Sequence, residues 1–318
     1  MKTCFDTNVL PQKKASAAAK AQSVLNRDKY LIMLVAPVII YFIIFHYVPM
    51  YGVIIAFKDF DVSLGINNSP WVGLQWFSEF FSSVYFGRIL KNTVILSAYN
   101  LLWGFPIPII FALILNELKN GLYKKTIQTI SYFPYFMSMV IVVGMLVNFV
   151  SPRFGIVNQL LNFFGKESVD FMGDPKYFRF LYVASDIWKN FGWNSVIYLA
   201  ALTGINPDLY EAARVDGAGK WKQLIRITIP GLAPTMVIML ILGVGSIMSV
   251  GFEKIILMYN PAVYETADVI STYVYRRGIL GAQYSFASAV GLFNSVINLI
   301  LLFSVNKISK KLGGTSLW

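Results

Sequence analysis

Six long apolar runs constrain this sequence more than any other feature. A helix needs about 20 apolar residues to cross roughly 30 Å of hydrocarbon, and each run is that long. The runs cover residues 30–57, 89–115, 127–150, 178–202, 231–252 and 285–305. Prolines in the first three predict kinks, because neighbouring helices can satisfy the carbonyls that a proline frees. The pattern predicts an all-α, polytopic membrane protein with six transmembrane helices.

One membrane domain accounts for nearly the whole chain. We assign it to residues 29–318, after a polar tail at residues 1–28 that lacks the features of a cleaved signal peptide. Of the 318 residues, 56% are hydrophobic and only 14% are charged, too few to cover a soluble globule with polar surface. The net charge is +11, but the basic residues lie in loops beside the apolar runs, so we expect no nucleic-acid partner.

The residues that usually build catalytic or metal centres are scarce. Cys4 and His46 are the only cysteine and histidine, so we expect no intramolecular disulfide, no metal site and no catalytic triad. The sequence contains no GxxxxGK[ST] phosphate-binding loop. We therefore expect a chain that is not an enzyme, binds no cofactor and does not hydrolyse ATP itself.

The distribution of basic residues predicts the orientation in the membrane. An even number of spans places both termini on one side, and Lys and Arg favour the cytoplasmic side. The face with both termini and loops 116–126 and 203–229 holds 16 of the 27 Lys and Arg residues. This predicts cytoplasmic termini and a cytoplasmic loop at 203–229.

Within that loop, residues 206–217 are predicted to form a short docking helix. Asn206 suits the N-cap, Pro207 the first helical position and Asp208 the positive end of the helix dipole. The small side chains of Ala212 and Ala213 allow close approach by another surface, and Gly217 suits the helix end. A plain connector between membrane helices is the alternative from composition alone.

The same loop carries a family motif. Glu211-Ala212-Ala213, then three residues and Gly217, then nine residues and Ile227-Thr228-Ile229-Pro230, resembles the EAA loop of ATP-binding-cassette importer permeases. Ile229 stands where leucine is commoner. The resemblance implies that the ATPase-coupling residues are Glu211, Ala212, Ala213, Asp216, Gly217, Ile229 and Pro230.

Two further stretches narrow the resemblance. Residues 49–60 with 71–73, and residues 267–278, are similar to the polysaccharide and oligosaccharide branch of carbohydrate-importer permeases, as is the ending 314–318. This implies the type I importer fold, with a coupling helix in the cytoplasm and a location in the bacterial inner membrane.

The resemblance also implies partners and a mechanism. A second homologous permease subunit would share the bilayer, two ATPase subunits with ATP and Mg would dock beneath, and an extracellular solute-binding protein would deliver an oligosaccharide. Transport would follow alternating access, which requires the loop to bind two ATPase states with different free energies.

The alternative functions are a secondary transporter and a membrane-embedded enzyme. The sequence lacks the carboxylate-rich relay of the first and the convergent catalytic groups of the second.

The fourth apolar run is unusually polar for a membrane helix. A charge near the bilayer centre costs about 2.5–3.5 kcal/mol on insertion scales, so such residues usually face protein or a water-filled cavity. Asp186, Lys189, Asn190 and Trp193 are expected to share one helix face. An ion pair between Asp186 and Lys189 that only makes the helix insertable is an equal alternative.

A substrate pathway is the functional interpretation of this helix. Aromatic rings stack on sugar rings while amides bond hydroxyl groups, so this set suits a carbohydrate better than a metal ion, which prefers clustered carboxylates. Asn294 in the last run either lines the pathway or bonds a neighbouring helix. The predicted pathway residues are Asp186, Lys189, Asn190, Trp193, Asn194, Tyr198 and Asn294. Lys189 would favour an acidic sugar.

Overall fold

The computed structural model describes residues 28–313 and 316–317. The predicted tail at 1–28, except Asp28, lies outside the described residues. The chain divides into two compact units, Met1–Ile54 and Ile55–Trp318. Secondary structure in the described part is helical apart from one isolated antiparallel bridge between Lys58 and Trp71.

The first unit contains most of the first apolar run. Lys29–Phe57 is long and apolar enough to span a membrane. It is built from α2 (Lys29–Phe42), the π-helical turn η1 (Ile43–Tyr47), α3 (Val48–Met50) and the 3₁₀ helix η2 (Tyr51–Phe57).

Both π-helical turns of the spanning segments lie directly before a proline. η1 ends two residues before Pro49, and η4 (Leu224–Thr228) ends two residues before Pro230. A proline ring clashes with the carbonyl four residues earlier, and a widened turn relieves that clash without ending the helix. Near Pro49, where the sequence predicts a kink, the helix contains a π turn.

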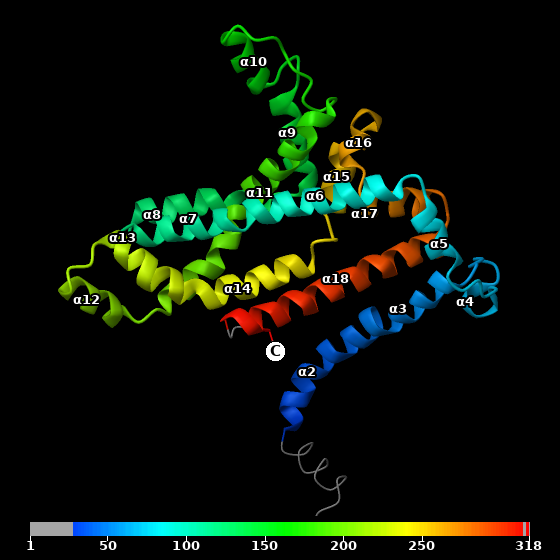
Figure 1. The fold of residues 1–318 in the computed structure, drawn as a ribbon, viewed down its shortest axis with the longest axis horizontal. Coiled ribbons are helices and arrows are strands. Elements are labelled where there is room, and N and C mark those ends of the chain that lie inside the picture. Colours follow the sequence, from blue (N-terminus) through cyan, green and yellow to red (C-terminus); the bar gives the residue numbers. More distant parts are fainter. Residues whose placement is uncertain (1–27, 314–315, 318) are drawn as a thin grey trace, which may run out of the picture. The chain divides into compact units, whose positions relative to one another are not determined.

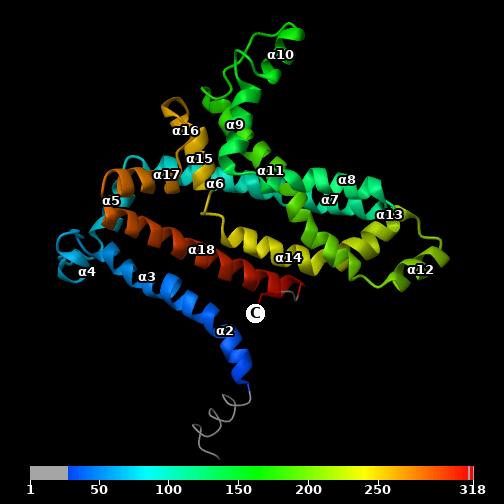
Figure 2. The ribbon, with the colours of Figure 1, turned by 180° about the vertical axis from the view of Figure 1, so that it is seen from behind.

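The second unit holds the remaining membrane helices (Figure 1). Besides Lys29–Phe57, three described helices are long and apolar enough to span a membrane, and a bent pair adds a further candidate. The three are α6 (Phe86–Gly104) with α7 (Pro106–Glu117), α13 (Lys220–Gln223) with η4 and α14 (Ile229–Gly245), and α18 (Tyr284–Gly313). Figures 1 and 2 agree that α12 (Pro207–Val215) lies at one end of this unit and α5 (Gln75–Ser82) at the other.

The third apolar run, predicted as one span over 127–150 with a kink at its proline, is broken into two helices in the structure. α8 (Leu122–Tyr132) and the 3₁₀ helix η3 (Phe133–Phe136) are separated from α9 (Met139–Val150) by a bend of 102°. Pro134 begins the break, and Ser138 caps the new helix by accepting a hydrogen bond from Ile141 N. The proline therefore predicted the place of the kink, whereas the apolar pattern, which continues through the bend, did not predict its size.

The predicted fourth span is α11 (Pro175–Thr203), a helix of 29 residues. It is too polar to be counted among the spanning helices by hydropathy. It packs against α6, α7, α8, α9 and α14, and nine of its residues are buried. Gly192 permits a close approach, because a Cβ there would collide with the Ser131 backbone on α8. α11 therefore faces protein along much of its length, which explains how it tolerates polar residues.

The fifth span is shorter at its C-terminal end than the sequence predicted. α14 ends at Gly245, not near residue 252, and residues 246–251 form turns before α15 (Phe252–Met258). Asn298 on α18 holds these turns: its Oδ1 accepts from Met248 N at 3.0 Å and its Nδ2 donates to Ser249 Oγ at 2.9 Å. At the other end the helix already begins at Lys220, so the connecting loop is shorter than 203–229.

Short helices make up much of the rest of the unit, and in Figures 1 and 2 α10 (Ile156–Phe163) projects beyond α9. These short helices are α4 (Gly65–Asn68), α5, α10, α15, η5 (Pro261–Val263), α16 (Tyr264–Ala267), α17 (Ile270–Val274) and η6 (Tyr275–Leu280). The fully buried Asp268 joins several of them. Arg276 donates to both of its carboxylate oxygens, at 2.8 and 2.7 Å, and Arg88 on α6 lies 3.3 Å away. A buried carboxylate needs such partners.

Candidate functional site

α12 has the local structure that the sequence predicted. The Asn206 side chain accepts a hydrogen bond from Asp208 N at 3.0 Å, and Pro207 is the first helical residue. At the other end Gly217 has φ +73°, Gly217 N donates to Arg214 O at 3.1 Å and Ala218 N donates to Ala213 O at 2.8 Å. These two bonds form a Schellman motif, whose left-handed residue is usually glycine.

One side of α12 holds it to the rest of the unit. Tyr210 OH lies 3.0 Å from Thr228 Oγ1 on η4, and Gln223 Nε2 donates to Ala218 O at 2.7 Å. An exposed ion pair between Lys220 and Glu117 links the start of α13 to the end of α7 at 2.5 Å. Because both side chains are solvent-exposed, this pair adds little to stability.

The opposite side of α12 is exposed, and we call it the docking face. It consists of the exposed residues Asp208, Leu209, Glu211, Ala212, Val215 and Asp216. Leu209 is 52% exposed and Val215 88% exposed. Apolar side chains beside carboxylates on an isolated helix are typical of a surface that a partner covers. Ile229 and Pro230 lie apart from this face, where α14 begins.

Gly217→Val is expected to loosen the end of α12, because a β-branched residue is strained at φ +73°. The left-handed conformation costs roughly 1–2 kcal/mol for a residue with a Cβ. The amide of Ala218 should therefore exchange its hydrogen about 5- to 30-fold faster. Gly219→Val is the matched control, because Gly219 has φ −66° and both positions have open space for a Cβ. Equal exchange in both variants would contradict this account.

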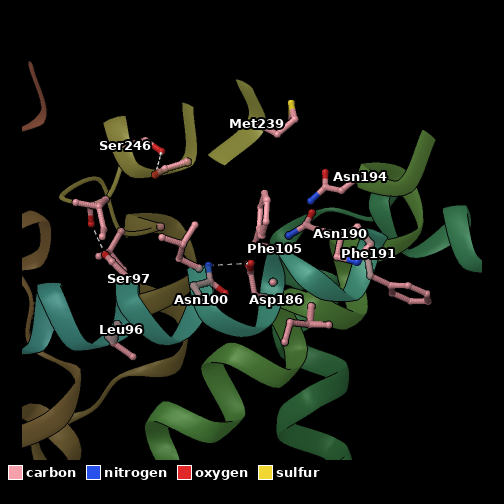
Figure 3. Close-up of a pocket in the computed structure, with 18 of the residues that line it drawn as sticks. Leu96, Ser97, Asn100, Phe105, Asp186, Asn190, Phe191, Asn194, Met239 and Ser246 are labelled. Carbon is pink, nitrogen blue, oxygen red and sulfur yellow. Dashed lines mark hydrogen bonds between the residues drawn. The ribbon is translucent and has the colours of Figure 1, made fainter. Parts of the chain in front are cut away.

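A polar cavity lies between membrane helices in the second unit (Figure 3). Its volume is about 300 Å³, and α6, α7, α11, α14 and the turns at 246–251 surround it. We call it the central cavity. Its polar lining residues are Ser97, Asn100, Tyr182, Asp186, Asn190, Asn194, Tyr198, Ser246 and Ser249. A few polar groups in a concave, otherwise apolar setting are typical of a small-molecule site.

An ion pair stands at the wall of the central cavity. Asp186 Oδ1 lies 3.4 Å from Lys254 Nζ, and Asp186 Oδ2 accepts from Asn100 Nδ2 at 3.1 Å. Lys254 is only 2% exposed and also donates to Tyr182 O at 2.6 Å. Asn100 Oδ1 is buried and has no hydrogen-bond partner among the described residues.

The predicted pathway residues separate onto two sides of α11. Asp186, Asn190, Asn194 and Tyr198 recur every four residues and line the central cavity. Asn190 and Asn194 lie one turn apart (Figure 3). The sequence had placed Lys189 and Trp193 on this same face, but the structure places them against the bend between η3 and α9.

Lys189 and Trp193 hold that bend. Lys189 Nζ donates to Tyr135 O and Met137 O, both at 2.8 Å, and so satisfies carbonyls freed where the helix breaks. Trp193 stacks on Tyr135 with ring centroids 4.8 Å apart. Asp186 pairs with Lys254, so the alternative of an Asp186–Lys189 ion pair is wrong.

Asn294 is also outside the described lining of the central cavity. It lies on α18, and its Oδ1 is buried without a hydrogen-bond partner among the described residues. Its role in the pathway stays a prediction.

Sequence reasoning missed Asn100 and the pairing of Lys254. Asn100 lies inside the second apolar run. A polar residue in such a run usually faces protein or a cavity, so its position was a signal that could have identified it. Lys254 follows the fifth apolar run, but its distance of 68 residues from Asp186 hides the pairing.

Comparison with known proteins identifies the family. The model of the family described as binding-protein-dependent transport system inner membrane component matches residues 104–314. The chain is 44% identical over 289 residues to the polygalacturonan/rhamnogalacturonan transport system permease protein YteP of Bacillus subtilis, covering 91% of this chain and 90% of that protein. It is also 44% identical to Protein LplB of the same organism over 287 residues, covering 90% of each.

Solved structures agree with these relatives. The chain is similar to one in the crystal structure of a bacterial ABC transporter involved in the import of the acidic polysaccharide alginate. The TM-score is 0.85 at 45% identity, covering 92% of this chain and 99% of that one. A second structure, of the bacterial alginate transporter with an alginate pentasaccharide-bound periplasmic protein, gives 0.86 at 44% identity and covers 94% and 100%. The chain therefore belongs to the family of binding-protein-dependent transport system inner membrane components, and it is a permease subunit of an ABC importer.

Proposed function

We propose that this permease subunit forms part of the path by which an ATP-driven importer takes up an oligosaccharide. The observation that carries the proposal is the central cavity, where Asn100, Asn190 and Asn194 gather between membrane helices. Amides both donate and accept hydrogen bonds, as neutral sugar hydroxyls require. The names of YteP and of the alginate transporter, whose cargoes are polysaccharides, support the same class of cargo.

The charge of the cargo is not set by Lys189 in this proposal. Its Nζ is already bonded to two carbonyls, and the charged lining residue Asp186 is neutralised by Lys254. The cavity therefore recognises hydroxyl groups, and selection for an acidic or neutral sugar belongs to groups elsewhere in the importer.

The energy would come from partners that this family implies. We propose that two ATPase subunits, which bind ATP and Mg, contact the docking face, and that a second homologous permease subunit completes the membrane part. A solute-binding protein would deliver the oligosaccharide at the end opposite α12. This orientation places α12 and both termini in the cytoplasm, in agreement with the excess of Lys and Arg on that side.

Reconstitution tests the whole proposal. The chain would be expressed with its genomic neighbours, purified with whatever copurifies, and assayed in liposomes for ATP hydrolysis and sugar uptake. Hydrolysis that rises with one class of oligosaccharide-loaded binding protein is expected. A stable complex without an ATPase subunit, whose uptake follows an ion gradient, would show a secondary transporter instead.

Asn194→Leu tests the central cavity. Losing one hydrogen bond of about 0.5–1.5 kcal/mol should raise the half-saturating concentration of loaded binding protein about twofold to tenfold. Asn148→Leu is the control, because Asn148 is exposed on α9 and its side chain donates to Gly144 O within its own helix. If both variants transport like the parent, Asn194 belongs to packing rather than to the path.

A further inference from the structure

A second cavity lies on the other side of α6 and α11 from the central cavity. Its volume is about 520 Å³, and we call it the lateral groove. Tyr99, Trp103, Ile107 and Phe180 form an apolar wall, and Lys176 and Arg179 stand at its end near the start of α11. Among the described residues of α6 and α11, Ile187 lines both cavities, and the other lining residues of the two cavities differ.

The apolar wall is open to its surroundings. Phe180 is 70% exposed, Trp103 55% and Tyr99 44%. Tyr99 and Trp103 lie on the membrane-spanning segment Phe86–Glu117, and Phe180 lies on the neighbouring helix α11. The groove therefore opens at the depth of the bilayer. Along α11 the lining runs from Lys176 to Ile187, about 17 Å at 1.5 Å per residue. That length is close to half of the roughly 30 Å hydrocarbon thickness, the depth of one leaflet.

The charge at one end of the groove suits an anion. Arg179 Nη2 donates to Asn92 Oδ1 at 3.0 Å, but its Nε is buried without a hydrogen-bond partner among the described residues. Lys176 is exposed, and its position in the first turn of α11 adds the positive end of a helix dipole. Asp174 is the neighbouring carboxylate, and it is engaged in capping Lys176 N at 2.9 Å.

We propose that the lateral groove binds an anionic phospholipid of the leaflet opposite α12. The headgroup phosphate lies at Lys176 and Arg179, and one acyl chain follows Trp103 toward Ile107. An oligosaccharide does not fit this description, because the wall offers no amides. The lipid proposal does not rest on the identity of the cargo or on coupling to ATP. The lipid proposal can therefore fail while the proposed transport function holds, and the reverse is also true.

Trp103 supplies an internal reporter for the test. The importer complex would be placed in nanodiscs of phosphatidylcholine that contain phosphatidylglycerol brominated on its acyl chains, which quenches nearby tryptophan emission. Subtracting a Trp103→Phe complex isolates the signal of this residue. Brominated phosphatidylcholine at the same mole fraction measures ordinary contact with bulk lipid.

A preference for the anionic lipid is expected. One basic residue near the membrane surface increases binding of an anionic lipid about fivefold. Brominated phosphatidylglycerol should therefore quench Trp103 at a severalfold lower mole fraction than brominated phosphatidylcholine, and Lys176→Gln should reduce that preference about fivefold. Lys166→Gln, which removes an exposed charge outside the groove, should leave it unchanged.

Two results would overturn the proposal. Equal quenching by both lipids would show that the groove takes up bulk lipid without selection. No quenching by either lipid, together with cross-linking of a Phe180→Cys variant to another subunit, would show that protein covers the groove.

Discussion

Glu211→Arg is expected to abolish uptake while leaving the chain inserted in the membrane. Glu211 is exposed on the docking face, and no side chain pairs with it among the described residues, so its replacement should cost α12 little stability. A partner that complements Asp208, Glu211 and Asp216 must present basic groups. Removing one member of a buried, hydrogen-bonded charge pair costs about 2–5 kcal/mol, so coupled transport should fall about 30-fold or more.

Uptake and copurification of the ATPase should be measured together. Loss of both is expected, with normal amounts of the chain in the membrane. Glu167→Arg is the control, since Glu167 is an exposed carboxylate outside α12. Normal uptake by the Glu211→Arg variant would remove Glu211 from the contact with the ATPase.

Asp186→Leu is expected to destabilise the chain more than Lys254→Met. The first change leaves the Lys254 ammonium, 2% exposed, without its counter-ion. Stranding a buried charge costs about 3–5 kcal/mol. The second change leaves the Asp186 carboxylate, which is 23% exposed, lines the central cavity and keeps its bond from Asn100.

Thermal unfolding in detergent would measure this difference. The double variant Asp186→Leu with Lys254→Met should recover most of the stability that Asp186→Leu loses, because neither charge remains. Additive losses in the double variant would show that the two side chains stabilise the fold independently. Equal stability of all three variants and the parent would show that the pair contributes nothing.

The local structure of α12 could be predicted residue by residue. Its N-cap, first-turn proline and terminal glycine act through neighbours within a few positions, so the sequence contains the whole interaction. Whether the predicted coupling residues contact an ATPase depends on a surface that is not in this chain. Their role stays a prediction.

The rest of the candidate site depends on contacts between distant segments. Pro134 marks a break in the third run, but the 102° bend also involves Lys189, more than fifty residues later in the chain. Helical periodicity grouped Asp186 and Lys189 on one face, since they are three positions apart in the sequence. Only the packing of distant segments shows that Asp186 faces the central cavity and Lys254, whereas Lys189 faces the bend.

The polarity of α11 has a consequence for biosynthesis. Asp186 and Lys189 would each cost about 2.5–3.5 kcal/mol in a helix that entered lipid alone, and their partners Asn100, Tyr135 and Met137 lie earlier in the chain. When α11 leaves the ribosome, the helices that receive its polar groups have therefore already been made. Lys254, however, emerges later, so Asp186 acquires its counter-ion last. Insertion of α11 is thus a cooperative step that begins with the helices before it and ends with α15 after it.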